Sequence, residues 1–287
     1  LTYPKGLGVS WRTEKDQWGA WHKKNYFDNH KYNCFDVTYV SNNIGARDKE
    51  DYKLNSKDKT IMLIGDSMLE GVGVNYENTL PSLIKEKTGM QTINLSAAGD
   101  FGPVQYYLIN DFYKEKFNYD DLYVFFLPYN DFTDNDWNFW KDVDTKRYRP
   151  YFKKINDSEF DIFYPDNAKR RQSFGIDISL KGLPKTIINN FTYSSNVLRF
   201  FKYRKYLNES NSVYLGTHNS NSGYYFQKKD AIDGSIYFLE KLFKNNAYKK
   251  ITLITVPFVG DIISHIDKND YTNLYWYIKI NNLVEKY

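Results

Sequence analysis

The feature that most constrains this fold is an alternation of short, continuously apolar segments with segments of helical periodicity. The apolar segments comprise residues 60–64, 91–96, 121–127 and 249–258. The segments with apolar residues three and four positions apart comprise residues 78–89, 103–117, 231–246 and 269–287. Strands that are apolar throughout and alternate with helices are typical of a parallel sheet covered on both faces. The pattern therefore predicts an α/β fold with a central parallel sheet.

Two long stretches do not follow this alternation. Residues 1–58 are aromatic-rich and irregular apart from a strand expected within residues 35–51, and we treat them as an N-terminal extension. Residues 132–235 separate the third predicted strand from the fourth. This distance far exceeds an ordinary connection, so we expect a long aromatic-rich insertion with structure of its own. The 287 residues fit a single domain that carries such an insertion.

The composition limits the partners and cofactors that we expect. The formal net charge is only +4 and lysine and arginine form no block, so no nucleic-acid partner is indicated. No apolar run is long enough to cross a bilayer. Cys34 is the only cysteine, which excludes an intramolecular disulfide and a zinc site built on several cysteines. The four histidines show no metal-ligand spacing and no phosphate-binding glycine pattern occurs, so we expect neither a metal nor another cofactor.

Three predicted strand ends carry groups suited to acyl transfer. The first strand is followed by Ser67, the second by Gly99 and the third by Asn130. Because parallel strands end at one edge of a sheet, we expect these residues to lie close together. A hydroxyl, a glycine N–H and a side-chain amide can serve as the nucleophile and the oxyanion donors of an acyl-transfer site.

Ser67 alone has a simpler interpretation. A serine just before a helix is usually an N-cap, whose hydroxyl accepts a hydrogen bond from an unpaired backbone N–H. A cap, however, predicts neither Gly99 nor Asn130 at the neighbouring strand ends, so their joint placement favours a nucleophile. Asp66 is interpreted as part of the turn, where its carboxylate accepts local backbone hydrogen bonds.

The motifs GDSM (65–68), AAGDFGP (97–103) and LPYND (127–131) resemble the three conserved blocks of the SGNH, or GDSL-like, hydrolases. The resemblance is close over residues 60–131 and looser in the fourth strand. It implies a flavodoxin-like three-layer α/β/α fold, with Ser67 as the nucleophile. It also implies an oxyanion hole made of the Ser67 N–H, the Gly99 N–H and the Asn130 side chain. The third block usually reads Gly-x-Asn-Asp, whereas Pro128 stands at the glycine position in this chain.

The segment YVSNNIGARDKE (39–50) is similar to the lead-in of SGNH proteins from bacterial polysaccharide gene clusters. This resemblance implies a serine ester hydrolase or O-acetyl transferase that acts on an acylated carbohydrate in an extracytoplasmic location. It leaves hydrolysis and transfer open, and it does not indicate an oligomeric state. The alternative is a glycan-binding protein that keeps the scaffold without catalysis.

The catalytic base is the missing part of this pattern. Members of the family end with Asp-x-x-His, and the nearest match is Asp261 with His265, which are four positions apart instead of three. His218, in a polar segment, is a weaker candidate. Either the chain stops at Tyr287 short of a final strand and the Asp-x-x-His segment, which we favour, or the protein has lost its base.

Overall fold

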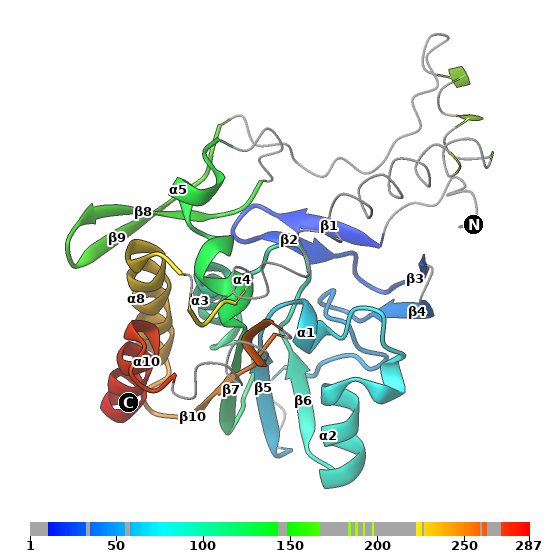
Figure 1. Cartoon of the computed structure of the whole chain (residues 1–287). Coiled ribbons are helices and arrows are strands. Elements are labelled where there is room, and N and C mark those ends of the chain that lie inside the picture. Colours follow the sequence, from blue (N-terminus) through cyan, green and yellow to red (C-terminus); the bar gives the residue numbers. More distant parts are fainter. Residues whose placement is uncertain are drawn as a thin grey trace.

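The centre of the molecule is a parallel sheet of four strands (Figure 1). The computed structural model describes residues 11–32, 35–54, 58–142, 148–166, 183–184, 187–188, 192, 197, 222–225, 227–258, 260–262 and 271–287. The strands are β5 (Thr60–Ile64), β6 (Gln91–Asn94), β7 (Asp121–Phe126) and β10 (Lys250–Thr255), in the spatial order β6-β5-β7-β10. All three pairings are parallel, which confirms the predicted sheet.

Side chains of the sheet alternate between two apolar layers, because successive residues of a strand point to opposite faces. On one face, Met62 and Ile64 of β5 belong to the main hydrophobic core, which includes residues of α3, α8 and α10. On the other face, Ile61 and Leu63 pack with Leu69 of α1. The fold is therefore the predicted three-layer α/β arrangement, with helices on both sides of the sheet.

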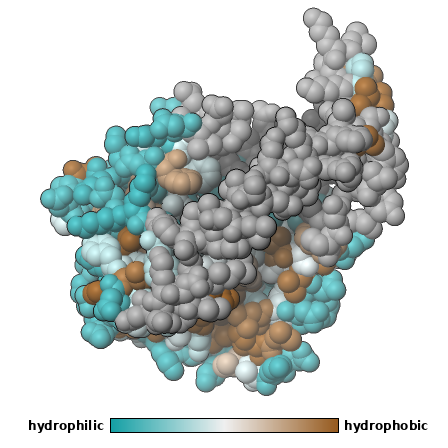
Figure 2. Space-filling view, in the orientation of Figure 1, coloured by the Kyte–Doolittle hydropathy of each residue, from teal (hydrophilic) through white to brown (hydrophobic). Residues whose placement is uncertain are grey.

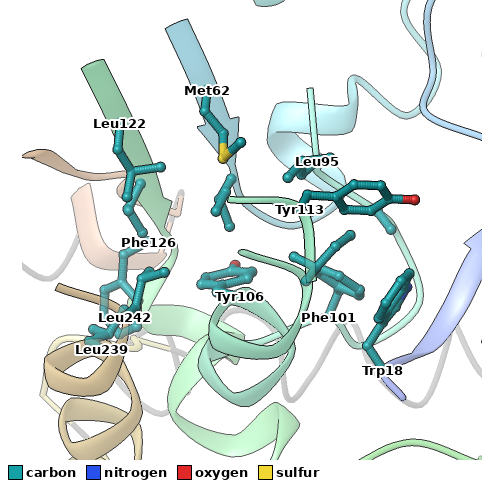
Figure 3. Close-up of a cluster of buried hydrophobic side chains, with 14 of the residues drawn as sticks. Trp18, Met62, Leu95, Phe101, Tyr106, Tyr113, Leu122, Phe126, Leu239 and Leu242 are labelled. Carbon is teal, nitrogen blue, oxygen red and sulfur yellow. The ribbon is translucent and has the colours of Figure 1, made fainter. Parts of the chain in front are cut away.

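The helices of the two layers have the following bounds. The main core is covered by α3 (Pro103–Tyr113), α8 (Lys229–Asn245) and α10 (Tyr275–Lys286). Figure 3 shows Leu122 and Phe126 of β7 pointing toward Leu239 and Leu242 of α8. The opposite layer holds α1 (Ser67–Glu70), the 3₁₀ turn η1 (Tyr76–Asn78) and α2 (Leu80–Thr88). As expected from the sequence, α2 ends at a left-handed cap, Gly89, with φ +70°.

The N-terminal extension is more regular than the sequence indicated. Residues 11–41 contain two antiparallel hairpins, β1 (Arg12–Lys15) with β2 (Gly19–His22) and β3 (Tyr26–Tyr32) with β4 (Phe35–Ser41). The prediction of an irregular segment was therefore wrong here, although the strand expected within residues 35–51 is β4. The β1–β2 hairpin lies beyond the carboxyl ends of the sheet strands (Figure 1). Long-range burial of Trp18 and Trp21 stabilises it, and such contacts leave no local sequence pattern.

The described part of the predicted insertion begins with two short helices and a hairpin. Helix α4 (Pro128–Asp134) runs across the predicted boundary at residue 132 and is followed by α5 (Trp137–Trp140). Strands β8 (Tyr151–Asn156) and β9 (Glu159–Phe163) form an antiparallel hairpin whose Phe152 and Phe160 pack against Phe238 of α8. The outer surface of this hairpin is hydrophilic (Figure 2). Helix α8 begins inside the predicted insertion, and most of residues 167–221 lie outside the described parts of the chain.

Within the described residues, no helix combines the length and the apolar character needed to cross a membrane.

Candidate functional site

Ser67 lies where β5 meets α1, and its position differs from that of a helix cap. Asp66 is the N-cap of α1, and its Oδ1 accepts a hydrogen bond from the Met68 N–H at 2.9 Å. Ser67 is the first residue of the helix, so the simpler alternative, in which Ser67 is the cap, is excluded, whereas the expected turn role of Asp66 is confirmed. A Cβ on Gly65 would lie 3.0 Å from the Cβ atoms of Leu69 and Phe125, so glycine allows α1 to pack closely on the sheet.

The Ser67 hydroxyl is weakly held. In the described part of the chain its hydrogen bond is a long one, 3.5 Å from Oγ to Asp66 Oδ2. The residue is partly exposed, and the neighbouring Met68 is 56% exposed. Helix α1 is a single turn of four residues, so its dipole adds little to the site. The hydroxyl is thus available to a ligand that approaches from solvent.

Asn130 lies in the first turn of α4, where the sequence suggested only a strand end. Proline suits the first position of a helix, and Pro128 occupies it, which accounts for the departure from glycine in this block. The Asn130 Nδ2 donates to Asp134 Oδ2 at 2.8 Å and to Asp66 Oδ2 at 3.3 Å. Its buried Oδ1 has no hydrogen-bond partner among the residues that the structure describes. Both amide hydrogens therefore point to carboxylates.

Asp66 brings Ser67 and Asn130 together. Its Oδ2 is in contact with the Ser67 hydroxyl and the Asn130 amide, while its Oδ1 caps α1. One buried carboxylate thus joins the ends of β5 and β7. The sequence predicted that Ser67 and Asn130 lie at one edge of the sheet. In the structure the Ser67 hydroxyl and the Asn130 amide both contact Asp66 Oδ2.

Gly99 lies in a tight turn after β6. The chain continues beside β5 beyond the end of β6, since the Leu95 N–H donates to the Leu63 carbonyl at 2.8 Å. The backbone then turns sharply, with φ +111° at Gly99 and +62° at Asp100. The Ala98 N–H donates to the carboxylate of Glu70 in α1. This bond places the turn beside the helix that carries Ser67.

Three buried aspartates lie at Asn130: Asp66 and Asp134 accept from its amide, and Asp131 is the next residue in the chain. The Asp131 carboxylate accepts hydrogen bonds from the Leu127 N–H at 2.7 Å and from the Tyr106 hydroxyl at 3.0 Å. Burial raises the pKa of Asp131 well above its ordinary value, and the nearby charges of Asp66 and Asp134 raise it further. Burial also raises the pKa of Asp66, although the Met68 N–H and the Asn130 amide oppose the shift. The edge of the sheet therefore combines hydrogen-bond donors with carboxyl groups that resist ionisation.

Of the residues considered for the catalytic base and its partner, the structure describes Asp261 but neither histidine. His265 and His218 lie outside the described residues, as does Cys34. Asp261 is buried, and its carboxylate accepts hydrogen bonds from the Ser222 hydroxyl at 2.7 Å, the Tyr224 N–H at 3.1 Å and the Phe258 N–H at 2.8 Å. Asp261 thus ties the segment after β10 to residues 222–224. The pairing of Asp261 with His265 stays a prediction.

Two buried charged groups near the site were missed by the sequence analysis. Glu70 faces His22 of the β1–β2 hairpin, with 3.6 Å between Oε1 and Nε2. Arg149 lies just before β8. Its Nη1 is 3.0 Å from the Asp100 carbonyl oxygen and 3.1 Å from Asp100 Oδ2. Each pair joins residues that are far apart in the chain, and no spacing pattern predicts such contacts.

Aromatic side chains lie beside the site. Tyr129, next to Asn130, stacks on Phe258 with 4.2 Å between the ring centroids and an angle of 20° between their planes. Tyr129 is 39% exposed and Phe258 is partly exposed. The stack follows β7 and β10, so it stands at the same edge of the sheet as Ser67.

The fold and this edge define an α/β protein in which polar groups from three neighbouring strand ends gather at the carboxyl side of a parallel sheet. Among the described residues, no group of three or more His, Cys, Asp or Glu side chains could hold a metal ion. No model of a known protein family matches the chain, and no curated protein is significantly similar to it.

Proposed function

We propose that this protein is a serine-dependent ester hydrolase or O-acetyl transferase of the SGNH type, acting on an acylated carbohydrate. The main support is the contact of the Ser67 hydroxyl and the Asn130 amide with one carboxylate oxygen of Asp66. Because Asp66 caps α1, the Ser67 hydroxyl is not needed as a cap. A carbohydrate substrate is supported by the partly exposed stack of Tyr129 on Phe258, since aromatic faces pack well against sugar rings. We also propose an extracytoplasmic location, which is supported only by the resemblance to SGNH proteins of bacterial polysaccharide gene clusters.

In the proposed reaction, Ser67 Oγ attacks the carbonyl carbon of the ester. The serine proton passes to a base and the carbonyl oxygen becomes an oxyanion. The Ser67 N–H, the Gly99 N–H and the Asn130 amide stabilise this oxyanion. Collapse of the tetrahedral intermediate expels the sugar alcohol, which takes up the proton, and leaves an acyl-serine. Water then releases a carboxylic acid, or a second sugar hydroxyl takes the acyl group. His265 is the candidate base from the sequence.

The proposal is tested with a fluorophosphonate probe, which phosphonylates activated serines. The native full-length protein should be labelled at Ser67, and Ser67→Ala should lose labelling and at least about 10³-fold in esterase activity. Ser158→Ala is the matched control, because Ser158 is exposed in the turn between β8 and β9. Labelling and activity that survive in Ser67→Ala would refute a role for Ser67 as nucleophile.

A non-catalytic glycan-binding protein is the second candidate, and one observation favours it. Both amide hydrogens of Asn130 are already engaged by Asp66 and Asp134, so no donor of this side chain is free in the resting structure. This function predicts saturable binding of an acetylated oligosaccharide to the full-length protein, with neither probe labelling nor turnover. Probe labelling at Ser67 would exclude it.

A further inference from the structure

The turn at residues 98–100 has a backbone conformation that its own residues do not all favour. Gly99 and Asp100 both have positive φ values, +111° and +62°. A glycine adopts such a conformation freely, whereas an aspartate in the left-handed region is strained by about 1 kcal/mol. The left-handed conformation of Asp100 persists only when surrounding groups hold it. Contacts from outside the turn therefore determine its shape.

Arg149 holds the turn from the side of the insertion. Its Nη1 donates to the Asp100 carbonyl at 3.0 Å and lies 3.1 Å from Asp100 Oδ2. The arginine is buried, and its guanidinium carbon lies 4.4 Å from the ring centroid of Trp140 and 5.0 Å from that of Tyr151. These rings favour the cation and restrict its movement. One rigid guanidinium thus fixes both the backbone and the side chain of Asp100.

Glu70 holds the same turn from the side of α1. One oxygen of its fully buried carboxylate accepts the Ala98 N–H, and the other faces His22. The His22 Nδ1 lies 2.8 Å from the Gly45 carbonyl, which can only accept, so this nitrogen carries a proton. Burial alone would raise the pKa of Glu70, but His22 and the charges of Arg12 and Arg47 hold it below its usual value. Glu70 therefore acts on the turn as a charged acceptor.

We propose that Glu70 and Arg149 are positioning residues that hold residues 98–100 in the conformation that presents the Gly99 N–H to an oxyanion. The catalytic meaning of this clamp rests on the proposed function, whereas its effect on the turn does not. Neither side chain touches the reacting atoms. Each acts through a hydrogen bond to a residue that flanks Gly99.

The clamp gives the N-terminal extension and the insertion a common role. His22, which faces Glu70, belongs to the β1–β2 hairpin, and Arg149 precedes β8. The two regions also touch each other, because a Cβ on Gly19 would lie 2.8 Å from the Tyr148 carbonyl and 3.1 Å from Arg149 Cα. Both additions to the parallel sheet thus converge on the turn after β6, and the site is complete only when they are in place.

The test combines hydrogen exchange with kinetics on the full-length protein. In Arg149→Met, amide exchange within residues 98–100 should rise about tenfold or more relative to exchange in β5 and β7. With p-nitrophenyl acetate as the probe substrate, kcat should fall about 10–100-fold while KM changes less than about threefold. Arg149→Lys should be intermediate, because an ammonium keeps the charge but cannot pack as a plane against the rings of Trp140 and Tyr151. Lys154→Met is the matched control, since Lys154 lies in β8, shortly after Arg149, and pairs with Asp157 and Asp230 at the surface.

The outcomes separate the clamp from the proposed function. If the wild-type protein shows no turnover but exchange rises locally in both Arg149 variants, the clamp stands and the esterase proposal fails. Unchanged exchange at residues 98–100 in a folded Arg149→Met protein would overturn the clamp. So would a uniform rise in exchange over the whole chain in Arg149→Lys, because a general loss of stability would then explain the kinetics. Glu70→Ala should reproduce the local rise from the other side of the turn.

Discussion

Asp66 combines two roles that substitutions can separate. Its Oδ1 caps α1 through the Met68 N–H at 2.9 Å, and its Oδ2 accepts from the Asn130 amide at 3.3 Å. Loss of an N-cap costs about 1 kcal/mol, and loss of a weak hydrogen bond costs about 0.5–1 kcal/mol. Removal of one of several neighbouring carboxylates offsets part of this loss. We therefore expect Asp66→Ala to lower the free energy of unfolding by about 1–2 kcal/mol.

This free energy corresponds to a small change in melting temperature. An unfolding entropy of about 2.1 cal/mol/K per residue gives about 0.6 kcal/mol/K for a chain of this length, so Tm should fall by about 2–3 °C. The rate of probe labelling and kcat/KM should fall much more, by about 10²–10³-fold, because Asn130 keeps its bond to Asp134 but loses the carboxylate that holds it beside Ser67. Differential scanning calorimetry and the p-nitrophenyl acetate assay measure the two effects.

Asp136→Ala is a close control for the stability effect. Asp136 caps α5, another single-turn helix, through an N–H···O bond of 2.9 Å to the Asn138 N–H, and it is also buried. Its removal should lower Tm about as much as Asp66→Ala and leave labelling of Ser67 intact. Equal losses of labelling in both variants would show that the effect of Asp66 is only structural.

Asp66→Asn separates capping from the orientation of Asn130. Asparagine is a good N-cap, so the free energy of unfolding should fall only by the about 0.5–1 kcal/mol of the lost contact with Asn130. With its oxygen on the Met68 N–H, however, the new amide turns donors toward the Asn130 Nδ2, and the contact of 3.3 Å becomes unfavourable. Activity should therefore fall as far as in Asp66→Ala. A variant that keeps both full stability and full activity would refute the orienting role of Asp66.

Two further predictions concern the buried acid and the aromatic stack. Since the pKa of Asp131 is raised by burial and by Asp66 and Asp134, the folded state holds its proton more tightly than the unfolded state. The contribution of Asp131 to stability therefore falls as pH rises from about 4 through its folded-state pKa. Over this range, the change of the urea midpoint with pH should be less negative for Asp131→Asn than for wild type. An identical slope would contradict this cause. Tyr129→Ala should weaken binding of an acetylated oligosaccharide by about 2–10-fold and leave kcat/KM for p-nitrophenyl acetate unchanged, whereas equal losses in both would argue against a sugar platform.

The central sheet was predictable because its determinants are local. The apolar run at residues 60–64 is β5, and the run at residues 121–127 contains β7. The helices followed from apolar periodicity and from end signals, such as Gly89 after α2. The predicted helix at residues 103–117 ends earlier, at Tyr113, although Phe117 still packs in the main core. Apolar spacing therefore did not mark where the helix ends.

The site was only partly predictable, since part of it depends on contacts between distant segments. Ser67, Gly99 and Asn130 could be identified because each follows a strand directly. The supporting pairs, Glu70 with His22 and Arg149 with Asp100, arise where the extension and the insertion fold over the sheet edge. A buried glutamate and a buried arginine have no sequence signature, since these residue types are mostly exposed.

In the proposed reaction, the Asn130 amide must turn from a carboxylate to the oxyanion. An oxyanion can reach its amide only by displacing a carboxylate, and the bond to Asp66, at 3.3 Å, is longer and weaker than the bond to Asp134, at 2.8 Å. Burial already raises the pKa of Asp66, and a second negative charge nearby would raise it further, so proton uptake by Asp66 would reduce the repulsion. The carboxyl that orients Asn130 in the resting site is then also the group best suited to release it when an oxyanion forms.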